Sequence, residues 1–286
     1  MPVNLTVYGA TDVGLVRKTN EDAFVVADLT GGNLVKEGES ARFDIGQRGV
    51  LLAVSDGMGG HQAGEVASAL VLQSLHDTMS KLDGTGNYDA LMEQATAQAN
   101  RAVWEAAHHP GRENMGATLT ALFIHHRHVH IVEVGDSRAY LVRGGQVRQV
   151  TRDQSYVQAM LDAGALTPEE AAHSTLRNVI LQAMGHKPEV QVARGRLELR
   201  HHDCFILCSD GLSNKVSADE LGKIVLASPS LEVACRRLIE LANQRGGEDN
   251  ITVVVGGVGG DLPPLVSGER ISATFLVLKE FDPPAS

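Results

Sequence analysis

The chain has 286 residues, 43% of them hydrophobic and 21% charged, with a formal net charge of −10. This acidic balance argues against non-specific binding to nucleic acid or to an anionic membrane surface, because both need a basic face. No stretch approaches the ~18 apolar residues of a membrane span, and the N-terminus has no signal-peptide pattern, so we expect a cytoplasmic protein that binds neither membrane nor nucleic acid.

The first half of the chain predicts strands followed by helices. Apolar runs indicate strands at residues 3–8, 24–27 and 49–54. A polar, glycine-rich insertion occupies residues 29–48. Apolar residues at helical spacing predict one helix from Gln62 to about residue 82 and a second at residues 88–108.

The second half returns to strands, which are expected at residues 117–124, 129–134, 139–142, 147–150, 204–208 and 251–255. Residues 154–184 are helical and rich in loops, and two further helices are expected to open at Ser217 and Ser230. Strands in blocks and helices in blocks favour an α+β protein over alternating βαβ units.

The composition changes after Val258, where GGDLPP is typical of a linker. We predict one domain at residues 1–258, followed by a linker and C-terminal tail at residues 259–286. The apolar middle of this tail could pack against the domain or dock a partner, and the sequence leaves both open.

Aspartates at strand ends form the most informative pattern. In three places an apolar strand ends and an aspartate follows beside a glycine: VLLAVSDG (Asp56), HIVEVGDS (Asp136) and CFILCSDG (Asp210). Asp22 in TNEDAF and Asp249 in GEDN each precede a strand. A single aspartate of this kind is usually a turn residue. Five at equivalent strand ends are harder to explain as turns.

If these strand ends meet, the carboxylates repel one another and need a counter-charge, which a divalent cation supplies. A ligand set made of oxygen, with no cysteine and no required histidine, favours Mg²⁺ or Mn²⁺ over structural zinc. Gly57 and Gly211 follow two of the aspartates and would let the main chain approach a cation.

Six motifs carry a family resemblance. In chain order they are RKTNEDAF, DGMGGH, GATLT, GDSRAYLVR, LCSDGL and GEDNITVVV. Together they resemble the bacterial branch of the metal-dependent protein phosphatases of type 2C. The resemblance implies a four-layer α-β-β-α sandwich, in which two antiparallel sheets are flanked by helices. It also implies a monomeric serine/threonine phosphatase that acts on phosphoproteins and opposes a cognate serine/threonine kinase.

The resemblance assigns two Mn²⁺ or Mg²⁺ ions per chain. Asp56 would bridge them, the Gly57 carbonyl would contact one ion, and Asp210 and Asp249 would hold the other. A water between the ions would lose a proton near neutral pH, because metal binding lowers its pKa from ~15.7 to about 7. The resulting hydroxide would attack phosphorus in line with the leaving oxygen.

Further roles follow from the same resemblance. Glu21 and Asp22 would act largely through metal-bound waters, and Asp136 would form a weaker third metal site with Asp210. Arg17 matches the arginine that binds the substrate phosphate, for which its planar fork of donors is suited.

The proton donor to the leaving group is left open. Met58 stands where many relatives carry a histidine, and a thioether cannot transfer a proton. His61 is the nearby alternative. It would either donate a proton or only order the loop, and a metal-bound water is the other candidate. Gln154 also replaces a histidine that is frequent in relatives.

Several features of the sequence have alternative interpretations. A phosphatase-like module that binds without hydrolysis would be expected to lose aspartates, and none is missing here. A cysteine phosphatase needs arginine six residues after its cysteine, and no cysteine of this chain has one. Histidines 125, 126, 128 and 130 could form a metal tract, although a solvated strand face is the simpler reading. Residues 154–184 correspond to the family's flap, which could gate substrates or merely cover the sheet.

Overall fold

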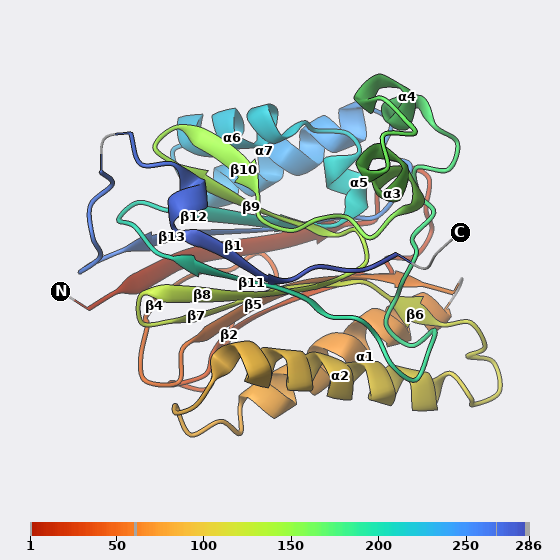
Figure 1. Cartoon of the computed structure of the whole chain (residues 1–286), viewed down its shortest axis with the longest axis horizontal. Coiled ribbons are helices and arrows are strands. Elements are labelled where there is room, and N and C mark those ends of the chain that lie inside the picture. Colours follow the sequence, from red (N-terminus) through yellow and green to blue (C-terminus); the bar gives the residue numbers. More distant parts are fainter. Residues whose placement is uncertain (1, 60–61, 267, 284–286) are drawn as a thin grey trace.

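The structure is a computed structural model that describes residues 2–59, 62–266 and 268–283. Two antiparallel sheets pack face to face, and helices cover both outer faces (Figure 1). This arrangement confirms the α+β sandwich expected from the sequence. Among the described residues, no helix combines the length and apolar character needed to cross a bilayer.

The first sheet contains six strands. Their order across the sheet is β10 (Gln146–Gln149), β9 (Arg138–Arg143), β12 (Cys204–Cys208), β13 (Ile251–Gly259), β1 (Asn4–Asp12) and β4 (Ser40–Asp44). Strands β9, β12 and β13 are neighbours, so the loops that precede or follow them come together at one end of this sheet.

The second sheet contains eight strands. Seven follow the order β14 (Phe275–Lys279), β11 (Ala193–Glu198), β8 (His128–Val134), β7 (Leu119–His125), β5 (Val50–Met58), β2 (Asp22–Asp28) and β3 (Asn33–Leu34). The eighth, β6 (Gly116–Ala117), pairs with the end of β5. All pairings in both sheets are antiparallel.

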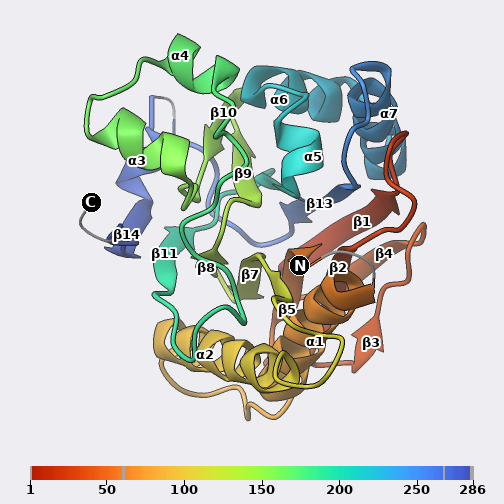
Figure 2. The same cartoon turned by 90° about the vertical axis from the view of Figure 1, so that its right-hand side faces the viewer.

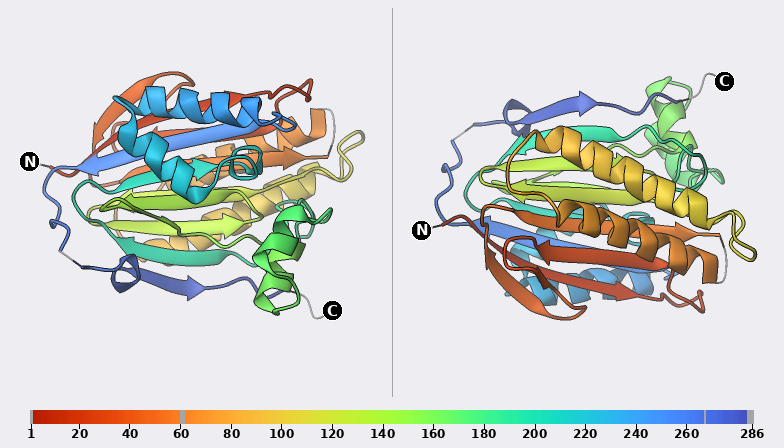
Figure 3. Two further views of the ribbon diagram at one scale, coloured as in Figure 1. Left: turned by 90° about the horizontal axis from the view of Figure 1, so that it is seen from above. Right: turned by 90° about the horizontal axis from the view of Figure 1, so that it is seen from below.

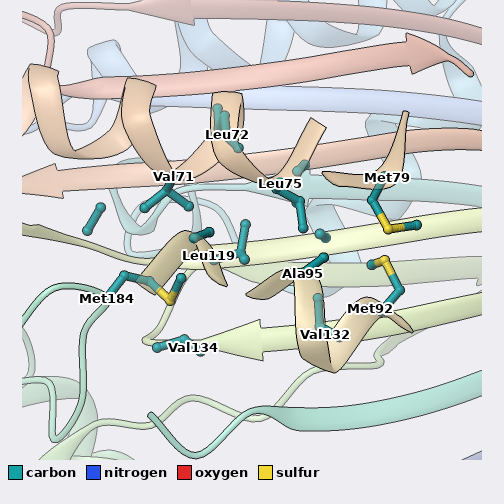
Figure 4. Close-up of a cluster of buried hydrophobic side chains, with 14 of the residues drawn as sticks. Val71, Leu72, Leu75, Met79, Met92, Ala95, Leu119, Val132, Val134 and Met184 are labelled. Atoms are coloured by element: carbon teal, nitrogen blue, oxygen red, sulfur yellow. The ribbon is translucent and has the colours of Figure 1, made fainter. Parts of the chain in front are cut away.

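Helices α1 (Gln62–Met79) and α2 (Tyr88–Ala106) cover the second sheet, as Figure 1 shows at its lower side. In Figure 4, Val71 and Leu75 of α1 lie near Leu119 of β7, and Met92 of α2 meets Met79. The helices form where the sequence predicts them, because apolar residues recur every three or four positions and give each helix one buried face.

Helices α5 (Asp210–Ser213), α6 (Ala218–Ala227) and α7 (Leu231–Gln244) cover the first sheet. The predicted capping box opens α6, because the Ser217 amide and hydroxyl both donate to the Glu220 carboxylate. Ser230 caps α7, whose buried face includes Leu238 and Ala242. A third apolar cluster, between the two sheets, completes the core.

The flap lies across one end of the sandwich (Figure 2). It carries the short helices α3 (Tyr156–Asp162) and α4 (Pro168–His173). The predicted capping box of α4 is present, with Thr167 and Glu170 bonded reciprocally and Pro168 in the first turn. An isolated bridge between Ala117 and Met184 joins the flap to β6, and a second bridge, between Ser155 and Ile180, lies within the flap.

Four strands were not expected from the sequence: β3, β4, β11 and β14. The strand expected at residues 117–124 is divided into β6 and β7. Strand β4 falls in the insertion interpreted as polar loop, and its side chains alternate between exposed and half-buried. Strand β14 lies beside β11 at the edge of the second sheet (Figure 3). Edge strands keep one side in water, so their sequences lack the continuous apolar run that identifies a central strand. The boundary at residue 258 stays a prediction.

Candidate metal centre

The end of the sandwich beneath the flap collects the strand-end aspartates. Asp22 is the first residue of β2 and Asp56 lies near the end of β5, and the antiparallel register places the two directly opposite each other. The sequence analysis placed Asp22 before its strand and Asp56 after its strand. Both strands are in fact longer and include these residues, because the two segments pair along their whole length.

The remaining aspartates each lie next to a strand of the first sheet. Asp210 opens α5 directly after β12, Asp249 precedes β13, and Asp136 lies in the turn between β8 and β9. Strand β12 lies between β9 and β13, so these turns share one edge of the molecule. Residues separated by more than a hundred positions therefore meet through sheet order.

These groups line one cavity of about 250 Å³. The described residues that line it are Arg17, Glu21, Asp56, Gly57, Met58, Gly59, Thr118, Asp136, Asn178, Ile180, Asp210, Asp249 and Asn250. All but one of the described site residues expected from the sequence are in this set. The exception, Asp22, is buried behind Asp56.

Asp22 has an incomplete set of hydrogen bonds. Its Oδ2 accepts a hydrogen bond from the Ser209 hydroxyl at 2.6 Å, whereas its buried Oδ1 has no partner. An unpartnered buried carboxylate oxygen is costly, because it has lost its hydration and gained no donor. A water held by a cation would supply that donor.

Two glycines are required by close main-chain approach. A Cβ on Gly57 would lie 2.1 Å from the Gly64 carbonyl oxygen, and a Cβ on Gly211 would lie 2.0 Å from that of Asn250. Both distances are far inside van der Waals contact, so any side chain would push these segments apart. The glycines that follow Asp56 and Asp210 therefore allow the tight packing of the loops that carry the carboxylates.

The carboxylates strongly perturb one another. Burial is the main cause that raises the pKa of Asp22 to about 7, and the charges of Asp210 and Asp249 add to it. Burial, with the charge of Asp249, raises the pKa of Asp210 to about 6. The pKa of Asp56 is raised well above its usual range by burial and then by its four aspartate neighbours. The pKa of Asp136 is raised well above its usual range by burial and by Asp210.

This environment suits hard cations. Two buried carboxylic acids, Asp22 and Asp136, two half-buried ones, Asp56 and Asp210, and an orphaned carboxylate oxygen favour a cation at the centre of the site. In the described part of the chain, no three Asp, Glu, His or Cys side chains enclose a common point closely enough to hold an ion alone. Main-chain carbonyls and water would have to complete the coordination, as hard divalent cations permit.

Arg17 lies at the rim of the cavity. Its Nη2 donates to Oδ2 of Asp249 at 2.9 Å, and half of the arginine side chain remains exposed. The guanidinium therefore has donors left over for a ligand that enters from solvent.

Several residues of the site were missed by the sequence analysis. Asn250 holds the N-terminal segment, because its Oδ1 accepts from the Glu21 amide and its Nδ2 donates to the carbonyls of Val13 and Thr19. The hydroxyl of Thr118 accepts from the Asp56 amide at 2.9 Å. Asn250 lies in the recognised motif GEDN and Thr118 in GATLT. The motifs could therefore have pointed to these two residues, but no role was assigned to them from the sequence.

The flap contributes to the same cavity through Asn178 and Ile180. The flap therefore forms part of the wall of the cavity, in addition to covering the sheet. His61, the candidate proton donor, lies outside the described residues.

The histidine cluster is neither a metal tract nor one solvated face. His125 and His130 are buried: a ring nitrogen of His125 lies 2.9 Å from the Gln47 carbonyl, and one of His130 lies 2.5 Å from Asp89. His126 and His128 are exposed, and His126 has a φ of 51° in the turn between β7 and β8. The period-two expectation was wrong at His130, because α2 packs over that part of the strand.

Comparison with known proteins agrees with this geometry. The family profile described as "Protein phosphatase 2C" matches residues 39–249, well over half of the chain. The chain belongs to the protein phosphatase 2C family.

Bacterial proteins are among the relatives of this chain. The serine/threonine protein phosphatase PstP of Mycobacterium tuberculosis is 39% identical over 264 residues, which cover 90% of this chain and 46% of PstP. This chain therefore spans about half the length of that relative. The serine/threonine phosphatase stp of Listeria innocua is 32% identical over 249 residues, 86% of this chain and 92% of that protein.

Solved structures of protein phosphatase 2C relatives share the fold. The crystal structure of M. tuberculosis PstP superposes with a TM-score of 0.77 at 37% identity, over 90% of this chain and 100% of that one. The PstP catalytic domain in complex with two manganese ions gives a TM-score of 0.74 at 36% identity, over 90% and 100% of the two chains.

Proposed function

We propose that this chain hydrolyses phosphoserine and phosphothreonine in proteins at a centre of two Mn²⁺ or Mg²⁺ ions. One observation carries the proposal: buried and half-buried aspartates from both sheets line a single cavity with an arginine at its rim. Manganese in the structure of the PstP catalytic domain supports the choice of metal.

The position of each residue suggests its role in metal binding. Asp56 is suited to bridge two cations because it pairs with Asp22 across the strands and also interacts with the charges of Asp210 and Asp249. We assign the Gly57 carbonyl, Asp210 and Asp249 to direct contact, and Glu21 and Asp22 to water-mediated contact. Asp136 and Asp210 would hold a weaker third ion. When bound, such cations lower the pKa of water toward neutrality and neutralise phosphoryl charge.

The protein binds and orients the phosphoryl group. Arg17 can offer free donors to two phosphoryl oxygens while it keeps its hydrogen bond to Asp249. Asn178 and Ile180 of the flap close one side of the cavity and limit how the substrate main chain approaches. Met58 lines the cavity but cannot move a proton. We therefore leave donation to the leaving group to His61 or to water.

We further propose that the protein is a cytoplasmic monomer that opposes a serine/threonine kinase of the same cell. The phosphoprotein substrates implied by the relatives' names support this assignment. Phosphoproteomics after deletion of the gene would identify these substrates as phosphoserine and phosphothreonine sites that gain occupancy.

The decisive experiment measures phosphate release from a phosphothreonine peptide. We expect activity with Mn²⁺, none in EDTA, and a loss of about 100-fold or more in kcat for Asp56→Asn, since even residues that only support metal ligands cost 10–100-fold. The matched control is Asp261→Asn, which removes one exposed carboxylate far from the cavity. Full activity in EDTA would overturn the metal mechanism. Manganese binding without phosphate release would instead indicate a regulatory binding module.

A further inference from the structure

A second cavity, of about 260 Å³, lies between the two sheets at the edge where β10 and β14 face each other. Its walls come from β8, β11, the segment of residues 148–155, helix α3, Leu181 of the flap and the C-terminal tail. No described residue lines both this cavity and the catalytic one. It therefore belongs to a separate site, which we call the edge cavity.

Glu133 of β8 lines the edge cavity and is only 3% exposed. Its Oε2 accepts from the Arg152 amide at 2.8 Å, whereas its Oε1 is buried and has no hydrogen-bond partner. In the described part of the chain, no lysine, arginine or histidine lies within ion-pair distance of this carboxylate. A lone acid between two sheets is a costly placement that core packing alone does not explain.

The neighbours of Glu133 in the sheet do not supply the missing donor. Its register partners are Ala193 on β11 and Thr120 on β7. Alanine has no donor, and the Thr120 hydroxyl is already committed to the Ser137 carbonyl at 2.6 Å. The acceptor at Oε1 therefore receives no donor from the strands on either side of it.

The other charges around the edge cavity are largely paired among themselves. Arg152 pairs with Asp162, and Arg138 holds Asp153 through several hydrogen bonds. The Arg148 guanidinium lies over the Phe275 ring, 5.9 Å from its centroid. Glu133 is thus the buried carboxyl group left without an ion-pair partner.

The lining is mixed. Apolar side chains, among them Ile131, Leu181, Phe275 and Phe281, lie beside charged side chains of both signs. A volume of this size admits a molecule of one or two rings, below the ~300–1,000 Å³ of pockets for drug-sized ligands.

We propose that the edge cavity binds a small planar aromatic or heteroaromatic ligand whose amine or amidine N–H donates to Oε1 of Glu133. The ring would lie among the apolar side chains, and a positive charge on the ligand would balance the carboxylate. The burial of Glu133, which raises its pKa well above the usual range, is relieved when such a donor arrives.

The edge cavity has a built-in reporter. The Arg152 amide donates to Oε2 of Glu133, and the Gln154 side-chain amide donates to the Glu133 carbonyl at 3.1 Å. Gln154 also accepts from the Gly135 amide at 2.9 Å, next to Asp136. Nuclear magnetic resonance signals of Arg152 and Gln154 should therefore move when Glu133 gains a ligand.

The test titrates benzamidine, a planar aromatic cation with N–H donors, into the full chain saturated with Mg²⁺, which keeps the catalytic carboxylates occupied. We expect saturable shifts of the Arg152 and Gln154 amide signals, with no such shifts for benzoate. Glu133→Gln should weaken binding by about ten-fold or more, because it removes a charge-assisted hydrogen bond but keeps an acceptor for Arg152. Glu280→Gln is the matched control and should bind normally, since it removes a carboxylate from another part of the wall.

Ala159→Leu provides a second variant that leaves every charge in place and narrows the edge cavity from α3. It should also weaken benzamidine binding. The proposal is overturned if no saturable shifts occur, if Glu133→Gln binds as well as the wild type, or if the shifts are confined to residues of the catalytic cavity. The result is independent of phosphatase activity.

Discussion

At the scale of single residues, the aspartates behave as a group whose properties none of them has alone. Asp22 never reaches the cavity surface, yet its charge is among the causes that raise the pKa of Asp56. Strand-end aspartates are ordinary turn residues until a fold brings several of them together. The same side chain is then a candidate metal ligand, because its ionised form needs a neighbouring cation.

Arg17 allows a residue-scale prediction. Arg17→Ala should raise KM for a phosphothreonine peptide by about ten-fold or more and change kcat less, because the lost hydrogen bonds to a charged group are worth about 1.5–3 kcal/mol. Folding should be almost unaffected, since the pair with Asp249 is largely exposed. Steady-state kinetics on Arg17→Ala and Arg17→Lys would measure this, and Lys should recover only part of the loss. Unchanged kinetics in both variants would remove Arg17 from substrate binding.

At the scale of elements, the flap and the tail are the two segments whose roles the sequence left open. The flap was expected either to gate or to cover, and its residues Asn178 and Ile180 line the catalytic cavity. The tail was expected either to pack locally or to dock a partner, and its strand β14 pairs with β11. In both cases the local sequence is compatible with each alternative. The contacts that the segment makes with the rest of the fold distinguish between them.

The flap predicts a substrate-dependent effect. Ile180→Ala should change KM for phosphopeptides by several-fold and leave hydrolysis of a small aryl phosphate nearly unaltered, because only the larger substrate reaches the cavity wall. The matched control is Leu176→Ala, a flap residue that is exposed and outside the cavity. Equal effects on both substrates would mean that Ile180 supports the metal site and does not select substrates.

The tail predicts a stability effect. A chain that ends at residue 258 loses the buried side chains of Leu262 and Ile271, and burial of each is worth about 1.5–3 kcal/mol. It also loses Glu269, which pairs with Arg200, and Thr274, whose hydroxyl accepts from Arg143 at 2.5 Å. We expect a free energy of unfolding lower by about 3–6 kcal/mol in chemical denaturation. An unchanged denaturation midpoint would show that the segment after 258 is dispensable for folding.

At the scale of the whole molecule, the end of the sandwich that carries the aspartates concentrates negative charge. The repulsion between these charges must be offset by stabilising interactions elsewhere in the fold. Three apolar clusters and two antiparallel sheets supply that stability. The chain is acidic overall, with a net charge of −10, so its own field does not attract a phosphorylated substrate. Cations at the site would reverse the sign of the charge where the substrate binds.

This concentration of charge predicts a pH dependence. The pKa of Asp22 rises from 3.8 to about 7 and that of Asp210 from 3.8 to about 6 in the folded, metal-free protein. At a pH between 3.8 and the raised pKa, each carboxyl group keeps its proton in the folded state and releases it in the unfolded chain. The free energy of unfolding contributed by these groups therefore falls as the pH rises from about 4 through about 7. Mg²⁺ or Mn²⁺ should restore that stability at neutral pH.

Urea denaturation at about pH 5 and about pH 8, with and without Mg²⁺, measures the effect. The loss of stability on going to the higher pH should be larger in EDTA than in Mg²⁺. Asp22→Asn should reduce this difference, since the amide carries no charge to repel. An identical pH dependence with and without metal would contradict the interpretation of these carboxylates as a cation site.

The sequence by itself determined the local features: the helices with one apolar face, the capping boxes at Thr167 and Ser217, the central strands and the family to which the chain belongs. These depend on residues close together in the chain, so their patterns can be read along it. The set of aspartates was recognisable for the same reason, because each stands next to its own strand.

Tertiary structure alone decided how these pieces meet. The opposition of Asp22 and Asp56, the edge strands β4 and β14, the flap wall and the buried Glu133 all depend on strand register and sheet order. Partners in a sheet can be more than two hundred residues apart, as Asn4 and Gly259 are. No short pattern encodes such a pairing, because it is selected by the burial of a whole face at once.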